Sequence, residues 1–139
     1  MAETRPLGTS SPVVDIRRVV KSNHEEILAL FQVYLRSPAD SRQAIVEQIL
    51  HRLVLHLEMV ENLIFQEIWK LGPQGRTLVG DAELGHEEIK SMILTRQQTE
   101  GDEDQALDEF FGDMMQTVRA SFTAEERDLL PLLDRSLDS

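Results

Sequence analysis

The stretch "RLVLHLEMVENLIFQEIW", residues 52–69, places a histidine in the middle of an apolar helix face. Apolar residues recur here every three or four positions, which is the spacing of one side of an α-helix. His56 falls on this stripe between Leu53 and Val60. The whole stripe comprises Ile45, Ile49, Leu53, His56, Val60 and Ile64. The stretch therefore predicts a long amphipathic helix whose buried side carries an imidazole.

Three other segments show the same period. The first begins at Ser11-Pro12, because a hydroxyl followed by proline is typical of a helix start. Another begins at Asp81, after a glycine-rich loop predicted over 73–80, and ends at Gly101. The last continues until Pro131 kinks or ends it. The stripes are Val13, Ile16, Val20, His24, Ile27, Phe31 and Leu35; then Ala82, His86, Ile89 and Ile93; then Phe111, Met114, Val118, Ser121, Glu125 and Leu129.

Short breaks separate these four helices. "SPAD" (37–40) interrupts the first two, and "LGP" (71–73) stops the second, with Gly72 in the usual role at a helix C-terminus. No convincing strand pattern is present. We therefore predict an all-α fold, an antiparallel up-down-up-down four-helix bundle. Residues 1–11 are predicted to be a flexible N-terminal arm, and 12–139 to form the single bundle domain.

Composition narrows the function. The chain of 139 residues has 14 Lys and Arg against 25 Asp and Glu, a net charge of −11. Nucleic acid and anionic membrane surfaces are therefore not expected partners. No membrane-spanning run and no signal peptide are evident, so we predict a soluble cytoplasmic protein. Without cysteine there can be no disulfide, no thiolate zinc site and no cysteine nucleophile.

The histidines on these stripes are predicted to meet at one level of the bundle. In an antiparallel pair of helices, residues equidistant from the turn lie at similar height. The midpoints of His24 with His56 and of His56 with His86 are positions 40 and 71, which fall in the two breaks. The midpoint of His86 and Ser121 falls between positions 103 and 104, in the turn "GDED" (101–104) before the last helix. Three helices therefore each supply an inward histidine, and the fourth supplies Ser121 and, one turn later, Glu125.

The residues alone leave two interpretations of this layer. A single histidine on an apolar face is usually a packed, hydrogen-bonded core residue. Several buried imidazoles cost desolvation unless each finds a partner, and one shared cation would serve all of them. An inward Glu125 supports the metal interpretation, whereas a Glu125 facing solvent beside Glu126 would not. His51 lies off the stripe and is predicted to be on the surface.

Four sequence blocks resemble those of the hemerythrin-like family, the HHE cation-binding domains. They are "NHEEIL" (23–28), "HLEMVENLIF" (56–65), "GHEEIK" (85–90) and "SFTAEERDLLP" (121–131). The resemblance implies a four-helix bundle that holds a carboxylate-bridged pair of non-haem irons. In that family, helices one and three each contribute a histidine, and helices two and four each contribute a histidine followed by Glu or Asp. The recurrence of "HEEI" at 24 and 86 also indicates a weak internal duplication.

Carried over position by position, the resemblance implies four metal ligands: His24, His56, His86 and Glu125. Val60 stands where the family has its first bridging carboxylate, and Ser121 replaces the helix-four histidine. Lys90 stands where true hemerythrins carry an additional histidine.

Neighbouring carboxylates are not expected to replace the bridging carboxylate that is missing at Val60. Glu61 is rotated by about 100° from Val60, and Glu58 points nearly opposite to His56, so neither reaches the core without local unwinding. The surviving ligands suit a single ion better than two irons. We expect iron as the cofactor, as one ion or a weak di-iron centre, with zinc or manganese as alternatives.

Three hypotheses follow. The first is a divergent hemerythrin-like metal-binding protein that senses dioxygen, redox state or nitric oxide, or handles iron. The second is a metal-free, degenerate bundle that acts as a regulatory or protein-interaction module. The third, a metal-dependent enzyme, is the least favoured, because no nucleophile or general-base pair accompanies the layer. The sequence gives no protein partner and no catalytic residue.

Overall fold

The computed structural model describes residues 12–98 and 104–138, and every regular element within them is helical. The elements are α1 (Pro12–Arg36), a 3₁₀ turn (Ala39–Ser41), α2 (Arg42–Met59), a π-helical segment (Val60–Ile64), α3 (Phe65–Trp69), α4 (Pro73–Gln98), α5 (Asp104–Ala124), a second π-helical segment (Glu125–Leu129) and α6 (Leu130–Asp138). The all-α prediction is confirmed for these residues. The predicted arm, 1–11, lies outside them.

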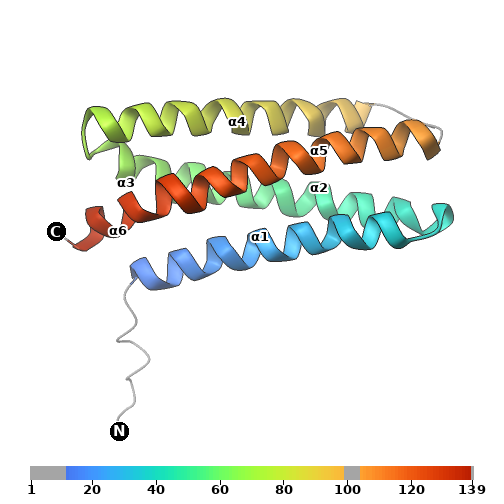
Figure 1. The fold of residues 1–139 in the computed structure, drawn as a ribbon, viewed down its shortest axis with the longest axis horizontal. Coiled ribbons are helices and arrows are strands. Elements are labelled where there is room, and N and C mark those ends of the chain that lie inside the picture. Colours follow the sequence, from blue (N-terminus) through green and yellow to red (C-terminus); the bar gives the residue numbers. More distant parts are fainter. Residues whose placement is uncertain (1–11, 99–103, 139) are drawn as a thin grey trace, which may run out of the picture.

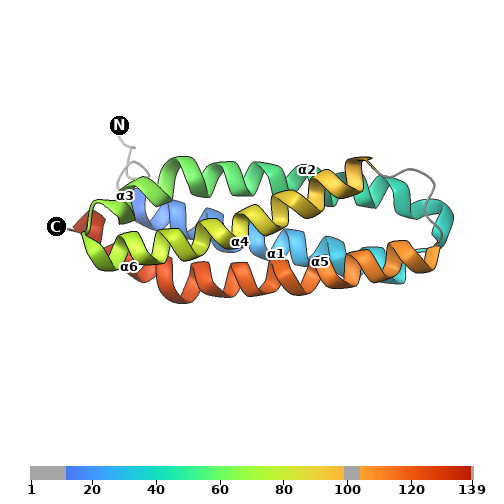
Figure 2. The same ribbon diagram turned by 90° about the horizontal axis from the view of Figure 1, so that it is seen from above.

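The elements form four long helical stretches: α1, α2 with α3, α4, and α5 with α6. Figures 1 and 2 show the four stretches along one long axis, with the α1–α2 and α3–α4 connections at opposite ends. None of the helices in the described ranges combines the length and the apolarity needed to cross a membrane. The site described below lies midway along these stretches.

The buried side chains form two hydrophobic clusters, one toward each end of the molecule. A polar residue separates the two clusters on every stretch. His24 lies between Val20 and Ile27, His56 between Leu53 and Val60, His86 between Val79 and Ile89, and Glu125 between Phe122 and Leu129. The core is therefore divided by a buried polar layer to which all four stretches contribute one residue.

The predicted stripes lie on the buried sides of the helices except at the end of α1, while the burial of Val13 lies outside what the structure describes. Leu35 is 46% exposed, whereas the neighbouring Tyr34 is fully buried and donates a hydrogen bond of 2.8 Å from its hydroxyl to Asp108. The last buried residue of this stripe is therefore Tyr34, three residues after Phe31, and not Leu35, four residues after it. Both steps are compatible with one helix face, and the hydroxyl's partner on α5 favours the tyrosine.

The predicted loop over 73–80 is wrong, because α4 already begins at Pro73. Gly72 adopts a positive φ of 106° and ends the preceding helical stretch, and Pro73 then fits the first helical position. Gly75 is needed for packing, since a Cβ there would lie 2.1 Å from the carbonyl oxygen of Ile68. The predicted helix end at Gly101 lies outside the described residues.

Pro131 does not end the last helical stretch, which continues to Asp138. The π-helical segment Glu125–Leu129 comes directly before it, and there the Leu130 N–H donates to the Glu125 carbonyl, five residues back. Proline has no N–H to give to the helix ladder. Pro131 therefore stands where the ladder is already displaced by one residue, and the helix continues beyond it.

Candidate metal centre

Three histidines and one glutamate meet in the buried polar layer. His24 comes from α1, His56 from α2, His86 from α4 and Glu125 from the start of the second π-helical segment. They are 2%, 1%, 1% and 2% exposed, respectively. The alternative of a Glu125 that faces solvent is therefore wrong. The structure brings together all four residues that the sequence singled out.

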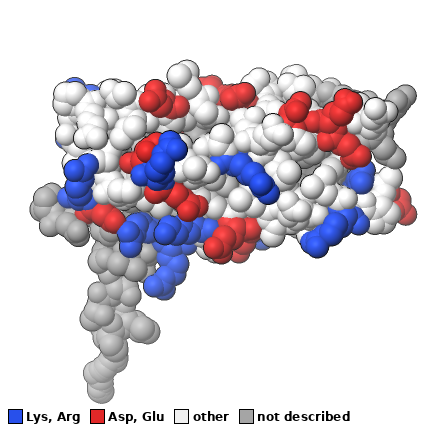
Figure 3. Space-filling view, viewed as in Figure 1, with Lys and Arg blue, Asp and Glu red and all other residues white. Residues whose placement is uncertain are grey.

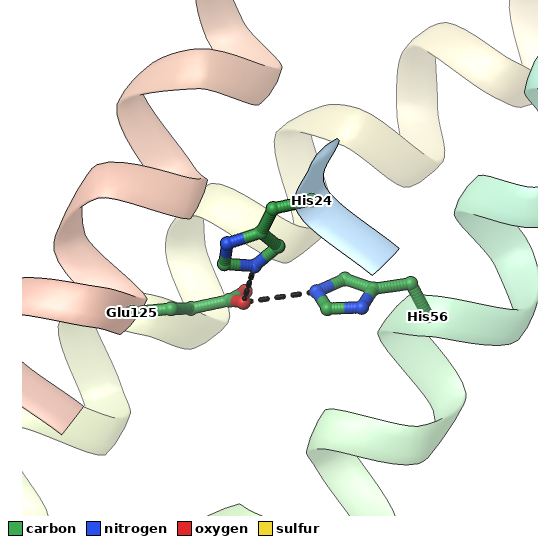
Figure 4. A group of neighbouring side chains, drawn as sticks. All are labelled: His24, His56 and Glu125. Atoms are coloured by element: carbon green, nitrogen blue, oxygen red, sulfur yellow. Dashed lines mark hydrogen bonds and ion pairs between the residues drawn. The ribbon is translucent and has the colours of Figure 1, made fainter. Parts of the chain in front are cut away.

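The Glu125 carboxylate is the centre of the cluster. Its Oε1 lies 2.8 Å from His24 Nε2 and 2.9 Å from His56 Nε2, as Figure 4 shows. Its Oε2 lies 3.1 Å from His86 Nε2. The two oxygens are thus used differently, since two imidazoles face one oxygen and the third faces the other.

Each imidazole is also held at its outer nitrogen. His24 Nδ1 lies 2.6 Å from Glu126 Oε2, and His86 Nδ1 lies 2.9 Å from Glu61 Oε2. His56 Nδ1 lies 3.3 Å from the Asn23 side-chain amide nitrogen. Fixing one ring nitrogen with a carboxylate or an amide leaves the other aimed inward, which is how proteins orient histidine ligands of metals.

The two π-helical segments explain how consecutive residues reach the layer. Residues next to each other in an α-helix point about 100° apart. A π-helical turn inserts one extra residue and widens the helix locally, often at functional sites. Glu125 and Glu126 then contact the two nitrogens of one ring, that of His24. The local unwinding that Glu61 requires is therefore present, and Glu61 reaches the outer side of His86.

Aromatic rings enclose the imidazoles. Phe122 stacks on His24 with ring centroids 3.9 Å apart, and its edge-to-face contact with His56 has a centroid distance of 5.1 Å. Phe65 packs on His86, also at 5.1 Å. These rings keep water from the cluster, so electrostatic interactions within it are stronger than they would be in solvent.

Hydrogen bonding makes the layer a stabilised ionic cluster. Burial alone would raise the pKa of Glu125, but hydrogen bonds from His24, His56 and His86 outweigh it and hold this pKa well below the ordinary value. Burial would lower the pKa of His86, yet hydrogen bonds to Glu125 and Glu61 raise it. The centre therefore contains a buried, ionised carboxylate, which is the charge that a bound cation needs.

Lys90 does not enter the layer. Its ammonium lies 2.8 Å from Glu61 Oε2, and the lysine side chain is 42% exposed. Burial opposes ionisation of Glu61, but hydrogen bonds from Lys90 and His86 lower its pKa overall. The lysine therefore neutralises an outer carboxylate and does not point its charge at Glu125.

A surface groove of about 680 Å³ opens beside the Glu61–Lys90 pair, on the side of the molecule formed by α3 and α4. Phe65, which packs on His86, is part of its wall. Glu61 is also part of this wall and contacts His86 from the same side. The side chains of Phe65 and Glu61 therefore lie between this groove and His86.

The remaining predicted positions lie where their side-chain chemistry suggests. Val60 is fully buried in one hydrophobic cluster, and His51 is exposed, as predicted. Ser121 lies beside Gly85, where an added Cβ would be 3.7 Å from its hydroxyl. Sequence reasoning missed Asn23 and Glu126. Their only signal is that each is next to a predicted ligand, because helical periodicity places both off the buried stripe.

The donor set fits a metal ion. One ligand atom from each of His24, His56 and Glu125 lies within 4.8 Å of the others. The outer nitrogen of His24 contacts Glu126, which leaves its inner nitrogen, Nε2, directed at Glu125 and available to a cation. Imidazole nitrogen together with carboxylate oxygen suits iron, zinc and manganese. These three residues could therefore hold a metal ion.

Comparison of the chain with protein-family models, with curated proteins and with solved structures gives no match.

Proposed function

We propose that this chain is a divergent hemerythrin-like protein that binds one divalent metal ion, with iron as the first candidate, in an antiparallel up-down-up-down four-helix bundle. His24, His56 and Glu125 are the proposed ligands. The observation that carries this proposal is the convergence of two inward imidazole nitrogens on one buried carboxylate oxygen. The four sequence blocks support the family, because each supplies one residue of the layer.

The proposed physiological role is a response to a small oxidant or to nitric oxide, or the handling of iron. A bound iron would supply an open coordination position and a redox change of one electron. Glu126 and Asn23 would keep the inner nitrogens of His24 and His56 aimed at the ion. Dioxygen transport is not proposed, since it needs the two-iron centre that Val60 and Ser121 leave incomplete.

Elemental analysis tests metal binding directly. Untagged protein purified without chelator is expected to contain about one transition-metal ion per chain, since buried imidazole and carboxylate ligands hold such ions tightly. His56→Ala removes a proposed ligand and should release the ion. His51→Ala is the matched control, because it changes an exposed histidine on the same helix. Equal metal content in the two variants would contradict the ligand assignment.

A second candidate, the metal-free interaction module, is favoured by one observation. The inner nitrogen of each histidine already has a hydrogen-bonding distance to Glu125, so the polar layer is satisfied by the protein alone. On this alternative, wild-type protein exposed to excess ferrous iron or zinc would contain no more metal than His56→Ala. The same elemental analysis therefore separates the two functions.

A further inference from the structure

The half of the layer around His86 differs from the half around His24 and His56. The resemblance implies a second cation there, with ligands at the positions of Val60, Lys90 and Ser121. Val60 offers no donor atom, and Lys90 carries a positive charge that is already paired with Glu61. Ser121 lies against Gly85. These residues do not fit a second metal ion.

A continuous chain of hydrogen bonds takes its place. The Lys90 ammonium donates to Glu61, Glu61 Oε2 lies 2.9 Å from His86 Nδ1, and His86 Nε2 lies 3.1 Å from Glu125 Oε2. His86 faces a carboxylate at both ring nitrogens. It also contacts the Glu125 oxygen that is turned away from His24 and His56.

We infer that the centre binds one cation through His24, His56 and Oε1 of Glu125, and that His86 is a positioning residue which fixes Oε2 of that carboxylate. Lys90, Glu61 and His86 form the strut that replaces the second cation of the family. This inference rests on the proposed function, because it assigns the parts of the same centre. It departs from the resemblance, which makes His86 a ligand.

Charge compensation and the rigidity of the carboxylate both favour this assignment of His24 and His56 as ligands and His86 as a positioning residue. Glu125 and Glu61 are two carboxylates within one cluster, and Lys90 supplies the positive charge that compensates the outer one. A carboxylate fixed at one oxygen presents its other oxygen in a defined direction, which preorganises a ligand. His86 performs this task from α4 while Phe65 packs on its ring. The metal affinity should therefore depend on Glu61 although Glu61 does not touch the ion.

Nuclear magnetic resonance of cadmium-loaded protein tests the assignment. The probe is cadmium-113 bound to full-length chain that carries nitrogen-15 in its histidines. One-bond nitrogen–cadmium couplings appear only on imidazoles bound directly to the ion. We expect such couplings on His24 and His56 and none on His86. A coupling on His86 would overturn the inference and leave the proposed function intact, whereas the absence of any coupling would overturn both.

Matched glutamate variants test the strut. Glu61→Ala removes the partner of His86, whereas Glu87→Ala removes an equal charge from an exposed position whose side chain pairs with Lys90. Loss of a side chain that hydrogen-bonds a metal ligand typically lowers metal affinity about tenfold or more. Glu61 acts on the ligand Glu125 through His86, one contact further from the ion, so we expect zinc affinity to fall by about tenfold in Glu61→Ala and to change little in Glu87→Ala.

The conservative variant provides a rescue. Glu61→Gln keeps an oxygen that can accept from His86, so it should recover most of the affinity lost in Glu61→Ala and retain couplings on two imidazoles. Equal losses in Glu61→Ala and Glu87→Ala would show that only charge matters and would overturn the strut. Glu61 lies at the rim of the groove and not in either hydrophobic cluster. We therefore expect Glu61→Ala and Glu61→Gln to fold.

Discussion

Glu125 is the residue on which the polar layer depends. It is 2% exposed and receives all three inward imidazoles on two oxygens. A buried carboxylate is costly unless donors surround it, and here each donor comes from a different helical stretch. Glu125 is therefore stable in the core only if its charge is compensated and if the helices that carry the three histidines pack in this arrangement.

Replacing Glu125 with glutamine should destabilise the chain even without metal. The amide keeps the shape but turns an NH₂ group toward an imidazole N–H, so a buried donor loses its acceptor. The expected loss in the free energy of unfolding is about 1–3 kcal/mol, measured by urea denaturation of chelator-treated protein. Glu109→Gln, an exposed position on α5, the helix that leads into this segment, serves as the control and should change stability little.

At the scale of single residues, the sequence was most informative where a polar side chain interrupts an apolar stripe. This signal predicts that His24, His56, His86 and Glu125 share one buried layer, whereas their role as metal ligands is what the resemblance implies. Asn23 and Glu126 lie off the stripe and look like ordinary surface residues. Their contacts with His56 and His24 depend on how the helices approach one another, which a single stripe does not encode.

The two π-helical segments are the elements that periodicity does not predict directly. Along α2 and α3 the buried positions His56, Val60, Ile64 and Ile68 follow in steps of four residues. Each such step overshoots a 3.6-residue turn by about 40°, so the buried face of a regular helix would drift. The extra residue in the segment Val60–Ile64 absorbs this drift and keeps the face directed inward. Repeated steps of four are therefore the signal in the sequence.

Two glycines on α4 give an opposite pair of predictions. Gly75→Ala would place a Cβ 2.1 Å from the Ile68 carbonyl oxygen, and the backbone there must shift. We expect it to destabilise the chain by about 1–3 kcal/mol. Gly80 has no atom within 4 Å of an added Cβ, so Gly80→Ala should stabilise the helix by about 0.5–1 kcal/mol.

Urea denaturation of both variants checks this pair. The comparison also tests the correction made to the segment 73–80. If these residues formed a loop, Gly80→Ala would bring no gain in helix propensity, and the two glycines would behave alike.

The molecule as a whole carries a net charge of −11, yet its charges are not evenly spread. Figure 3 shows Lys and Arg gathered over the N-terminal part of α1, where Arg17, Arg18 and Lys21 line a shallow hollow. The acidic excess elsewhere raises the local concentration of cations near the surface. The overall charge therefore agrees with a cation as the bound species.

Zinc should stabilise the whole chain if the centre binds it. A ligand that binds only the folded state at one hundred times its Kd adds about 2.7 kcal/mol. For a chain of this size that corresponds to a rise in Tm of roughly 8–10 °C. The measurement is thermal unfolding of chelator-treated protein with and without zinc.

Two controls accompany the zinc measurement. His56→Ala should show no rise in Tm, because it lacks one ligand. Magnesium should also have no effect on the wild type, since it prefers an all-oxygen shell. A rise that is equal in the variant and the wild type would place zinc somewhere else on the surface.

The division of the hydrophobic core has a consequence for assembly itself. If any one helical stretch slid by a single turn along its neighbours, an imidazole or the acid would face aliphatic carbon and lose every donor or acceptor. The free-energy cost of a misaligned packing is therefore larger than it would be in an entirely apolar core. The polar layer therefore favours one relative alignment of the four helical stretches. This preference does not require a bound ion and does not depend on which ion binds.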